Sequence, residues 1–326
     1  MKKSLLALAA LTAFAGAASA QSSVTLYGRV DLSIGKGIGV DSKSLGNGSG
    51  SRLGLRGSED LGGGLSAIFN IEHRFDADTG AGQGITTRMW GARSLVGLKG
   101  GFGQVVLGRE YSTAFLGNQL GADPWGWDTV VNGTLDAPAG RGLNSSITGG
   151  AIAKVRYDNS ITYNVAAGGF SFGIQTAEQS APAMDSRPLN FAVGYAAGPL
   201  RATFGYEKTG DAGTDTEKWM SFNLQYNLGF MKVGGFYGTG NTETGNDHRS
   251  YMLTATAPMG AGEFRFSYGK LTNKTADVDA AKGFGVGYHY SMSKRTTLYA
   301  DLVRNTGALV GGSNETGYDV GIKHNF

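Results

Sequence analysis

The chain has 326 residues, and its 29 Lys and Arg against 26 Asp and Glu leave a net charge of +3, which gives no reason to expect a nucleic-acid partner. The absence of cysteine excludes a disulfide framework. The 55 glycines far exceed the roughly 7% share of ordinary proteins, and with 14 Tyr and 16 Phe they favour many tightly turned strands over helices.

Residues 1–20 have the features of a secretory signal peptide. Two lysines give a positive start, residues 5–16 form a short apolar run, and residues 18–20 (Ala-Ser-Ala) provide a small-residue cleavage site. A membrane anchor would need about 20 consecutive apolar residues. We therefore expect export and cleavage, with residues 21–326 forming a single domain.

A regular alternation of apolar and polar side chains begins directly after this segment. Along residues 24–34, Val, Leu, Gly and Ile share one face, while Thr, Tyr, Arg, Asp and Ser share the other. A period of two residues predicts a β-strand. Fifteen further strands are predicted at residues 51–57, 65–75, 88–99, 104–109, 154–165, 170–178, 189–197, 200–208, 217–227, 230–239, 249–257, 263–271, 282–291, 295–305 and 316–326.

The connections between the sixteen predicted strands alternate in length. Short turns such as 100–103 alternate with longer polar connections such as 35–50 and 76–87, and residues 58–64 have the composition of a turn. None of the six prolines falls inside a predicted strand, as a fully paired ladder requires. Short turns at one rim and long loops at the other are typical of an outer-membrane barrel.

The second face of the predicted strands decides the fold class. A soluble β-sandwich or propeller would bury that face in a dry core, but here it repeatedly carries Arg, Lys, Asp and Asn, which are costly to bury. A water-filled lumen inside and lipid outside remove the conflict, and closure leaves no unpaired strand edge in the bilayer. We therefore predict an all-β, 16-stranded antiparallel transmembrane β-barrel.

Residues 111–150 interrupt this pattern. They show no sustained strand or helix period, and they contain Pro124, Pro138, Trp125 and Trp127. A connection of this length without regular structure is usually functional or disordered. Because it is the third of the long connections and the predicted lumen carries arginines that it could face, we expect it to fold into the lumen as a constriction loop.

Enzyme motifs give no candidate for catalysis. Residues 169–173 match G-x-S-x-G, but that motif needs a strand, a sharp turn and a helix, whereas Ser171 lies in an alternating strand. The four histidines have no metal-ligand spacing, and no phosphate-binding glycine motif is present. We expect no catalytic residues, no cofactor and no metal site.

Arginines on the polar faces of separate strands carry more information. Arg29, Arg52, Arg93 and Arg156 would be ordinary solvated charges on a soluble protein. If the polar face lines a lumen, they become a basic wall, and arginine suits this role because it stays charged and is held by a planar hydrogen-bonding fork.

Several motifs resemble those of Gram-negative general diffusion porins, most closely the β-proteobacterial branch. They are Leu-Tyr-Gly-Arg ending at Arg29, the run Ser-Arg-Leu-Gly-Leu-Arg-Gly-Ser-Glu-Asp-Leu at residues 51–61, Leu-Gly-Arg-Glu-Tyr at residues 107–111, and the terminal Phe326. The resemblance covers residues 21–326. It implies a trimer of 16-stranded barrels with the third loop inside, placed among outer-membrane lipids and lipopolysaccharide. The last strand, ending in Phe326, resembles the signal read by the barrel-assembly machinery.

The resemblance also suggests site residues. Arg29, Arg52 and Arg93 match the family's basic wall by motif position, and Arg156 matches at a different spacing. Glu72 and Arg74 point into the same lumen by strand parity. The family's Pro-Glu-Phe-Gly-Gly is replaced by Pro-Trp-Gly-Trp-Asp at residues 124–128, so the acidic candidates in the loop are Asp123, Asp128 and Asp136.

The expected function is therefore passive diffusion of ions and small hydrophilic solutes through an outer-membrane porin. The missing loop glutamate and the arginines favour a modest anion preference. Two alternatives remain open. A channel selective for a sugar or an organic anion is suggested by Trp125 and Trp127, and a barrel enzyme would need a Ser/His constellation at the rim.

Overall fold

The computed structural model describes residues 22–82, 88–131, 153–179, 186–210, 217–242, 244–308 and 315–326. The predicted signal peptide and the candidate Asp136 lie outside these residues. Among the described residues, no helix is long and apolar enough to cross a membrane.

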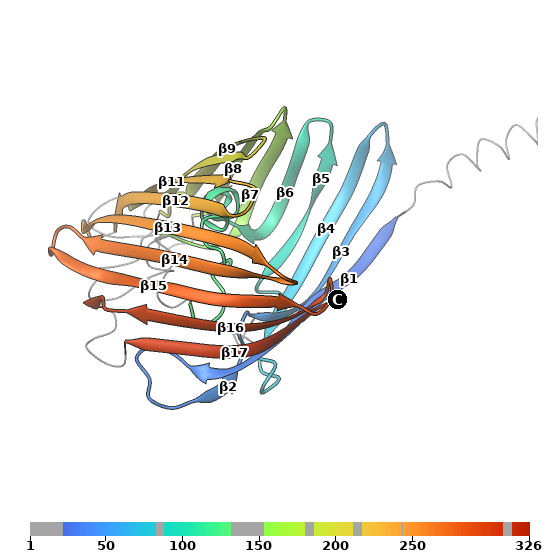
Figure 1. Cartoon of the computed structure of the whole chain (residues 1–326). Helices are drawn as coiled ribbons and strands as arrows, with labels where there is room; N and C mark the ends of the chain where they lie inside the picture. Colours follow the sequence, from blue (N-terminus) through green and yellow to red (C-terminus); the bar gives the residue numbers. More distant parts are fainter. Residues whose placement is uncertain are drawn as a thin grey trace, which may run out of the picture.

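The described strands form one antiparallel sheet. They are β1 (Ser23–Lys36), β2 (Ser44–Gly46), β3 (Ser51–Gly62), β4 (Leu65–Phe75), β5 (Arg93–Gly100), β6 (Gly103–Tyr111), β7 (Arg156–Ala167), β8 (Phe170–Ala177), β9 (Leu189–Ala197), β10 (Leu200–Lys208), β11 (Lys218–Asn227), β12 (Lys232–Asn241), β13 (Asp247–Met259), β14 (Gly262–Asn273), β15 (Val278–Ser291), β16 (Thr296–Asn305) and β17 (Thr316–Asn325). Each long strand pairs with the next along the chain, as Figure 1 shows.

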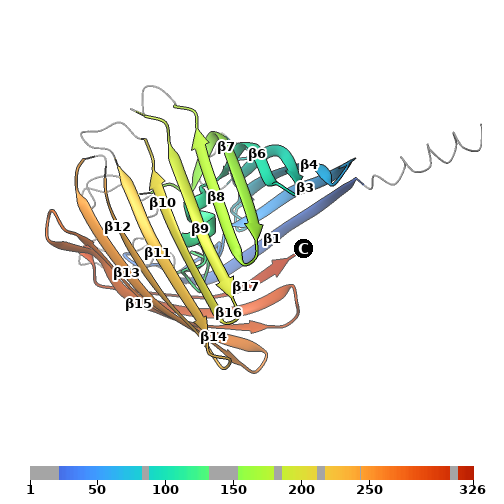
Figure 2. The ribbon, with the colours of Figure 1, turned by 90° about the horizontal axis from the view of Figure 1, so that it is seen from above.

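The sheet closes on itself between its first and last strands. β1 pairs with β3 on one flank and with β17 on the other, where the register runs from Arg29 opposite Asn325 to Lys36 opposite Tyr318. The short β2 adds three residues against the end of β1. Sixteen long strands therefore form a barrel with one small extra strand, which confirms the predicted fold class; Figure 2 shows strands such as β8 and β9 on the side of the barrel opposite β1 and β17.

The two faces of the wall differ as the alternation predicted. On β1, the side chains of Val24 and Ile34 are 67% and 61% exposed on the outside, whereas Asp31 is fully buried on the inside. The same contrast recurs around the ring, where large apolar side chains such as Leu253 and Val320 face outward. An apolar outer surface and a polar interior suit lipid outside and water inside.

Three details of the sequence prediction are wrong. β3 continues to Gly62, so most of the turn predicted at residues 58–64 is strand. β5 begins at Arg93 rather than at residue 88. Pro258 lies inside β13, contrary to the expectation that strands lack proline. This proline is tolerated because the pairing with β12 ends at Thr256, so only the β14 flank of Pro258 is paired.

The apolar core lies where the segment after β6 meets the inner wall. This segment contains a short π-helix, η1 (Phe115–Gln119), and then Trp125 and Trp127. Their buried side chains form one cluster with inward-facing residues of β12, β13 and β16, namely Phe236, Met252 and Val303.

Polar contacts fasten the same segment to strands far from β6 around the ring. These contacts include four hydrogen bonds: Ser112 Oγ to Glu207 on β10 (2.9 Å), Asn118 Nδ2 to Ser221 on β11 (2.6 Å), Trp125 Nε1 to Asp301 on β16 (2.8 Å) and the Val130 amide to Asp319 on β17 (3.2 Å). All four partners are buried on the inner face of the wall.

Candidate pore constriction

Three arginines stand side by side on the inner face of neighbouring strands. In the pairing register, Arg29 of β1 lies opposite Arg52 of β3, and Arg52 lies opposite Arg74 of β4. Like charges placed directly opposite each other destabilise a sheet. Three like charges in register are therefore unfavourable for the pairing of β1, β3 and β4 unless other contacts compensate.

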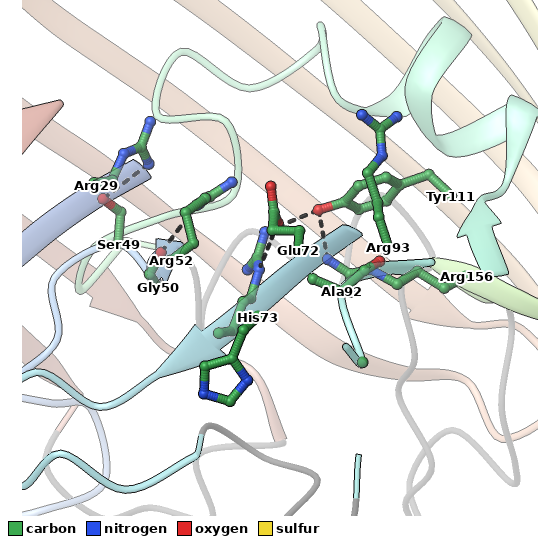
Figure 3. A network of polar contacts seen from close by, with 12 residues as sticks. Arg29, Ser49, Gly50, Arg52, Glu72, His73, Ala92, Arg93, Tyr111 and Arg156 are labelled. Carbon is green, nitrogen blue, oxygen red and sulfur yellow. Dashed lines mark hydrogen bonds and ion pairs between the residues drawn. The ribbon is translucent and has the colours of Figure 1, made fainter. Parts of the chain in front are cut away.

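Hydrogen bonds to neighbouring residues hold two members of this row. Arg29 donates from Nε to Asn325 Oδ1 and from Nη1 to Ser49 Oγ, both at 3.1 Å, and Arg52 Nε donates to the Gly50 carbonyl at 3.1 Å. Figure 3 shows both guanidinium groups beside the residues that fix them. Neighbouring backbone and polar groups thus aim the positive charges.

Two further arginines gather around Tyr111 at the end of β6 (Figure 3). Arg156 lies directly opposite Tyr111 in the β6–β7 register, and its guanidinium carbon is 4.1 Å from the centre of the Tyr111 ring. The guanidinium carbon of Arg93 is 5.2 Å from the same centre. Arg74 Nη2 donates to the Tyr111 hydroxyl at 2.8 Å, which links this group to the row.

All five predicted arginines line one cavity of about 780 Å³. The same cavity is lined by Arg265 of β14 and Lys323 of β17, two cations that sequence reasoning did not select. Strand parity could have found them, because Arg265 alternates with outward Phe264 and Phe266, and Lys323 follows outward Ile322.

One predicted acid, Asp128, contacts the arginine row directly. Its carboxylate forms an ion pair with Arg29 at 3.1 Å. The flanking residues Trp127 and Thr129 have φ values of 63° and 65°, a left-handed conformation that costs free energy for residues other than glycine. The Thr129 amide donates to the Gly48 carbonyl at 2.8 Å, so the strained backbone is held where Asp128 meets Arg29.

Glu72 and Glu110 supply negative charge beside the arginines. Glu72, a predicted site residue, accepts a hydrogen bond from the Tyr27 hydroxyl at 3.1 Å and lies 3.7 Å from Arg74 Nε. Glu110, which sequence reasoning missed, forms an ion pair with Arg93 at 2.9 Å. Glu110 has the same strand parity as the buried Val106, and Tyr111, the last residue of β6, is buried beside it.

Asp123 is the most deeply buried of the loop acids that line the cavity. Its Oδ2 accepts a hydrogen bond from the Trp127 amide at 2.8 Å. Burial raises the pKa of Asp123 to about 7, because desolvation penalises the charged form more than these hydrogen bonds favour it. This carboxyl is therefore neutral in mildly acidic solution and charged in alkaline solution.

Positive charge outweighs negative charge around the cavity. Among the described residues that line it, Arg and Lys number seven, against the three carboxylates Glu72, Asp123 and Asp128. The described residues contain no cluster of three or more His, Cys, Asp or Glu side chains that could hold a metal ion. Fixed positive charge in such excess lowers the energy of a nearby anion relative to that of a cation.

A closed barrel with an apolar outside and charged side chains around an inner cavity is the architecture of an outer-membrane channel. The family model described as "Gram-negative porin" matches residues 7–308, and the chain belongs to that family. It is a general Gram-negative porin of the outer membrane, a channel protein rather than an enzyme.

Relatives of known name support the assignment. The chain is 35% identical to "Outer membrane porin protein 32" of Delftia acidovorans and 29% identical to an outer membrane porin protein of Bordetella pertussis, in each case over 100% of both chains. Among solved structures, it is similar to the "Anion-selective porin from Comamonas acidovorans", with a TM-score of 0.77 and 30% identity, covering 94% of this chain and 100% of that one.

Proposed function

We propose that this porin conducts ions and small hydrophilic solutes by passive diffusion with a modest preference for anions. The observation that carries the proposal is the excess of Arg and Lys over carboxylates around the cavity. Fixed positive charge at a narrow point lowers the energy of a passing anion and raises that of a cation. The solved relative described as anion-selective points in the same direction.

The proposal assigns the constriction to the connection at residues 111–150. Its described part reaches from β6 to β16 and β17 through buried hydrogen bonds, and Asp128 brings its carboxylate to Arg29. In this assignment, the arginines form the basic wall, and Glu72 and the loop aspartates form the acidic one. Asp136 belongs to the proposal by sequence position alone.

Reversal potentials in a potassium chloride gradient across a planar bilayer test the proposed selectivity. Chloride should be more permeant than potassium, and replacing Arg93 and Arg156 with glutamine should move the ratio towards potassium. Arg295→Gln, at the exposed turn before β16, removes the same charge away from the cavity and should leave the ratio unchanged. A clear potassium preference in the unmodified protein would contradict the proposal.

A channel selective for a sugar or an organic anion is the competing assignment. It would need aromatic faces exposed along the passage, but Trp125 and Trp127 are 4% and 2% exposed, and their indole nitrogens donate to Asp301 and to the Gln119 carbonyl. These rings serve packing and anchoring. Saturable block of conductance by a sugar or an organic anion would favour the competing assignment.

The same proposal includes the assembly expected from the family resemblance. The chain is exported with residues 1–20 as a signal peptide, inserted by the barrel-assembly machinery through the strand ending at Phe326, and assembled as a homotrimer among lipids and lipopolysaccharide. Light scattering of the detergent-solubilised protein measures the oligomeric state, and a monomer under native extraction would contradict it.

A further inference from the structure

Tyr111 lies at the centre of the charged cluster, although a tyrosine adds no charge to it. The side chain is 8% exposed, and its ring stacks on Phe115 with 5.6 Å between ring centres. Packing therefore fixes the ring, and with it the position of the hydroxyl group. The hydroxyl group is thus a hydrogen-bond acceptor at a fixed position for nearby arginine side chains, whether or not a solute is present.

The hydroxyl oxygen of Tyr111 accepts hydrogen bonds from two arginines on different strands. Arg74 Nη2 of β4 donates at 2.8 Å, and Arg156 Nη2 of β7 donates to the same oxygen. Two guanidinium groups that would otherwise repel each other are joined through one shared acceptor. Bonds from a charged donor are shorter and stronger than neutral ones, so this bridge holds both cations in place.

A second nitrogen of Arg156 is also held by a hydrogen bond. Its Nε donates to the Ala92 carbonyl at 2.9 Å, so Nε and Nη2 are held and the orientation of the planar group is fixed. The Arg93 guanidinium packs over the same ring and is held by Glu110. The tyrosine therefore helps to determine where each guanidinium group lies and how its plane is oriented at the cavity.

We infer that Tyr111 is a positioning residue that fixes Arg74, Arg93 and Arg156 so that the channel discriminates among anions by shape. This inference rests on the proposed anion conduction. The number of positively charged side chains sets the preference for permeant anions over permeant cations. The fixed orientation of the planar guanidinium groups instead favours planar oxyanions over spherical halides, because a planar oxyanion accepts two parallel hydrogen bonds.

The test compares nitrate with bromide, two monovalent anions of similar mobility in water but different shape. Bi-ionic reversal potentials, with potassium as the common cation, give the nitrate-to-bromide permeability ratio. We expect the ratio in the unmodified channel to exceed its free-solution value at least twofold. Tyr111→Phe, which keeps the ring and loses the acceptor, should bring the ratio back to the free-solution value, while the chloride-to-potassium ratio changes by less than twofold.

Two further variants separate positioning from general damage. Tyr163→Phe removes a hydroxyl that donates to the Phe102 carbonyl outside the cluster and should leave both ratios unchanged. Arg156→Lys keeps the charge but loses the planar fork, and it should reproduce the loss of nitrate discrimination. If Tyr111 acts through Arg156, combining Tyr111→Phe with Arg156→Lys should add little to either change alone.

An unchanged nitrate-to-bromide ratio in folded Tyr111→Phe overturns the inference, as does an unmodified channel with the free-solution ratio. Heat-modifiable migration in gels verifies folding, and if Tyr111→Phe does not fold, Arg156→Lys tests the same geometry. A potassium preference in the unmodified channel would defeat the proposed function instead. The nitrate-to-bromide permeability ratio, measured with potassium as the common cation, would still decide whether Tyr111 has this role.

Discussion

Replacing Asp128 with asparagine should raise the preference for anions about fivefold. The change removes one of the three carboxylates that line the cavity and keeps the shape of the side chain. Arg29 loses its charged partner but keeps its hydrogen bonds to Asn325 and Ser49, so its guanidinium should stay in place. The expected effect is thus one of charge and not of geometry.

The magnitude follows from Coulomb's law. An ion that passes about 8 Å from the carboxylate in water interacts with it by about 0.5 kcal/mol. Losing that charge favours an anion and disfavours a cation by equal amounts, so their difference changes by about 1 kcal/mol, or about fivefold in the permeability ratio. Because the screening length falls from about 8 Å at 0.15 M salt to about 3 Å at 1 M, the effect should fade in concentrated salt.

Reversal potentials at low and high ionic strength measure this effect. Glu59→Gln is the matched control, because Glu59 is an exposed acid on β3 at the rim opposite the long loops. Its loss should leave the chloride-to-potassium ratio unchanged at both ionic strengths. A chloride-to-potassium ratio that stays constant or falls in Asp128→Asn would refute the reasoning. An increase that persists unchanged at 1 M salt would show that pore geometry, and not charge, had changed.

Four other outcomes are expected. Arg52→Gln should lower the chloride-to-potassium ratio severalfold, because it removes the middle cation of the row; reversal potentials measure it. Raising the pH from about 6 to about 8 should ionise Asp123 and reduce the anion preference, whereas Asp123→Asn should show no such change. Since folding raises this pKa, the Asp123 contribution to stability is present below about pH 4 and is lost as the pH rises to about 7, which thermal unfolding can follow. Trp125→Phe should lower the unfolding temperature and increase open-channel noise, because Asp301 loses a buried donor worth about 1–3 kcal/mol.

The faces of the strands could be predicted because lipid and water impose opposite demands on alternate residues. The alternation of apolar and polar side chains was enough to place Arg29, Arg52 and Arg74 on the inner wall. It could not show that these three residues lie directly opposite one another, since register depends on the pairing of whole strands. The repulsion between these directly opposed charges could therefore be inferred only from the fold.

Residues at the ends of strands were harder to predict. Glu110 and Tyr111 are consecutive, and strict alternation would place only one of them inside, but both are buried at the end of β6. Arg265 and Lys323 obey the alternation and were passed over because no motif marked them. Their link to the constriction arises from ring closure, which brings β14 and β17 to the same cavity as β1.

The cluster of Phe115, Trp125 and Trp127 with the inner wall has a mechanical consequence. A ring of strands around water resists bending through its wall, and lateral pressure from the surrounding membrane acts to flatten it. The segment after β6 works as a cross-brace, because it is fastened to β10 and β11 near one end and to β16 and β17 near the other. Because the same segment carries Asp128, the contacts that anchor it across the ring also hold this carboxylate beside Arg29.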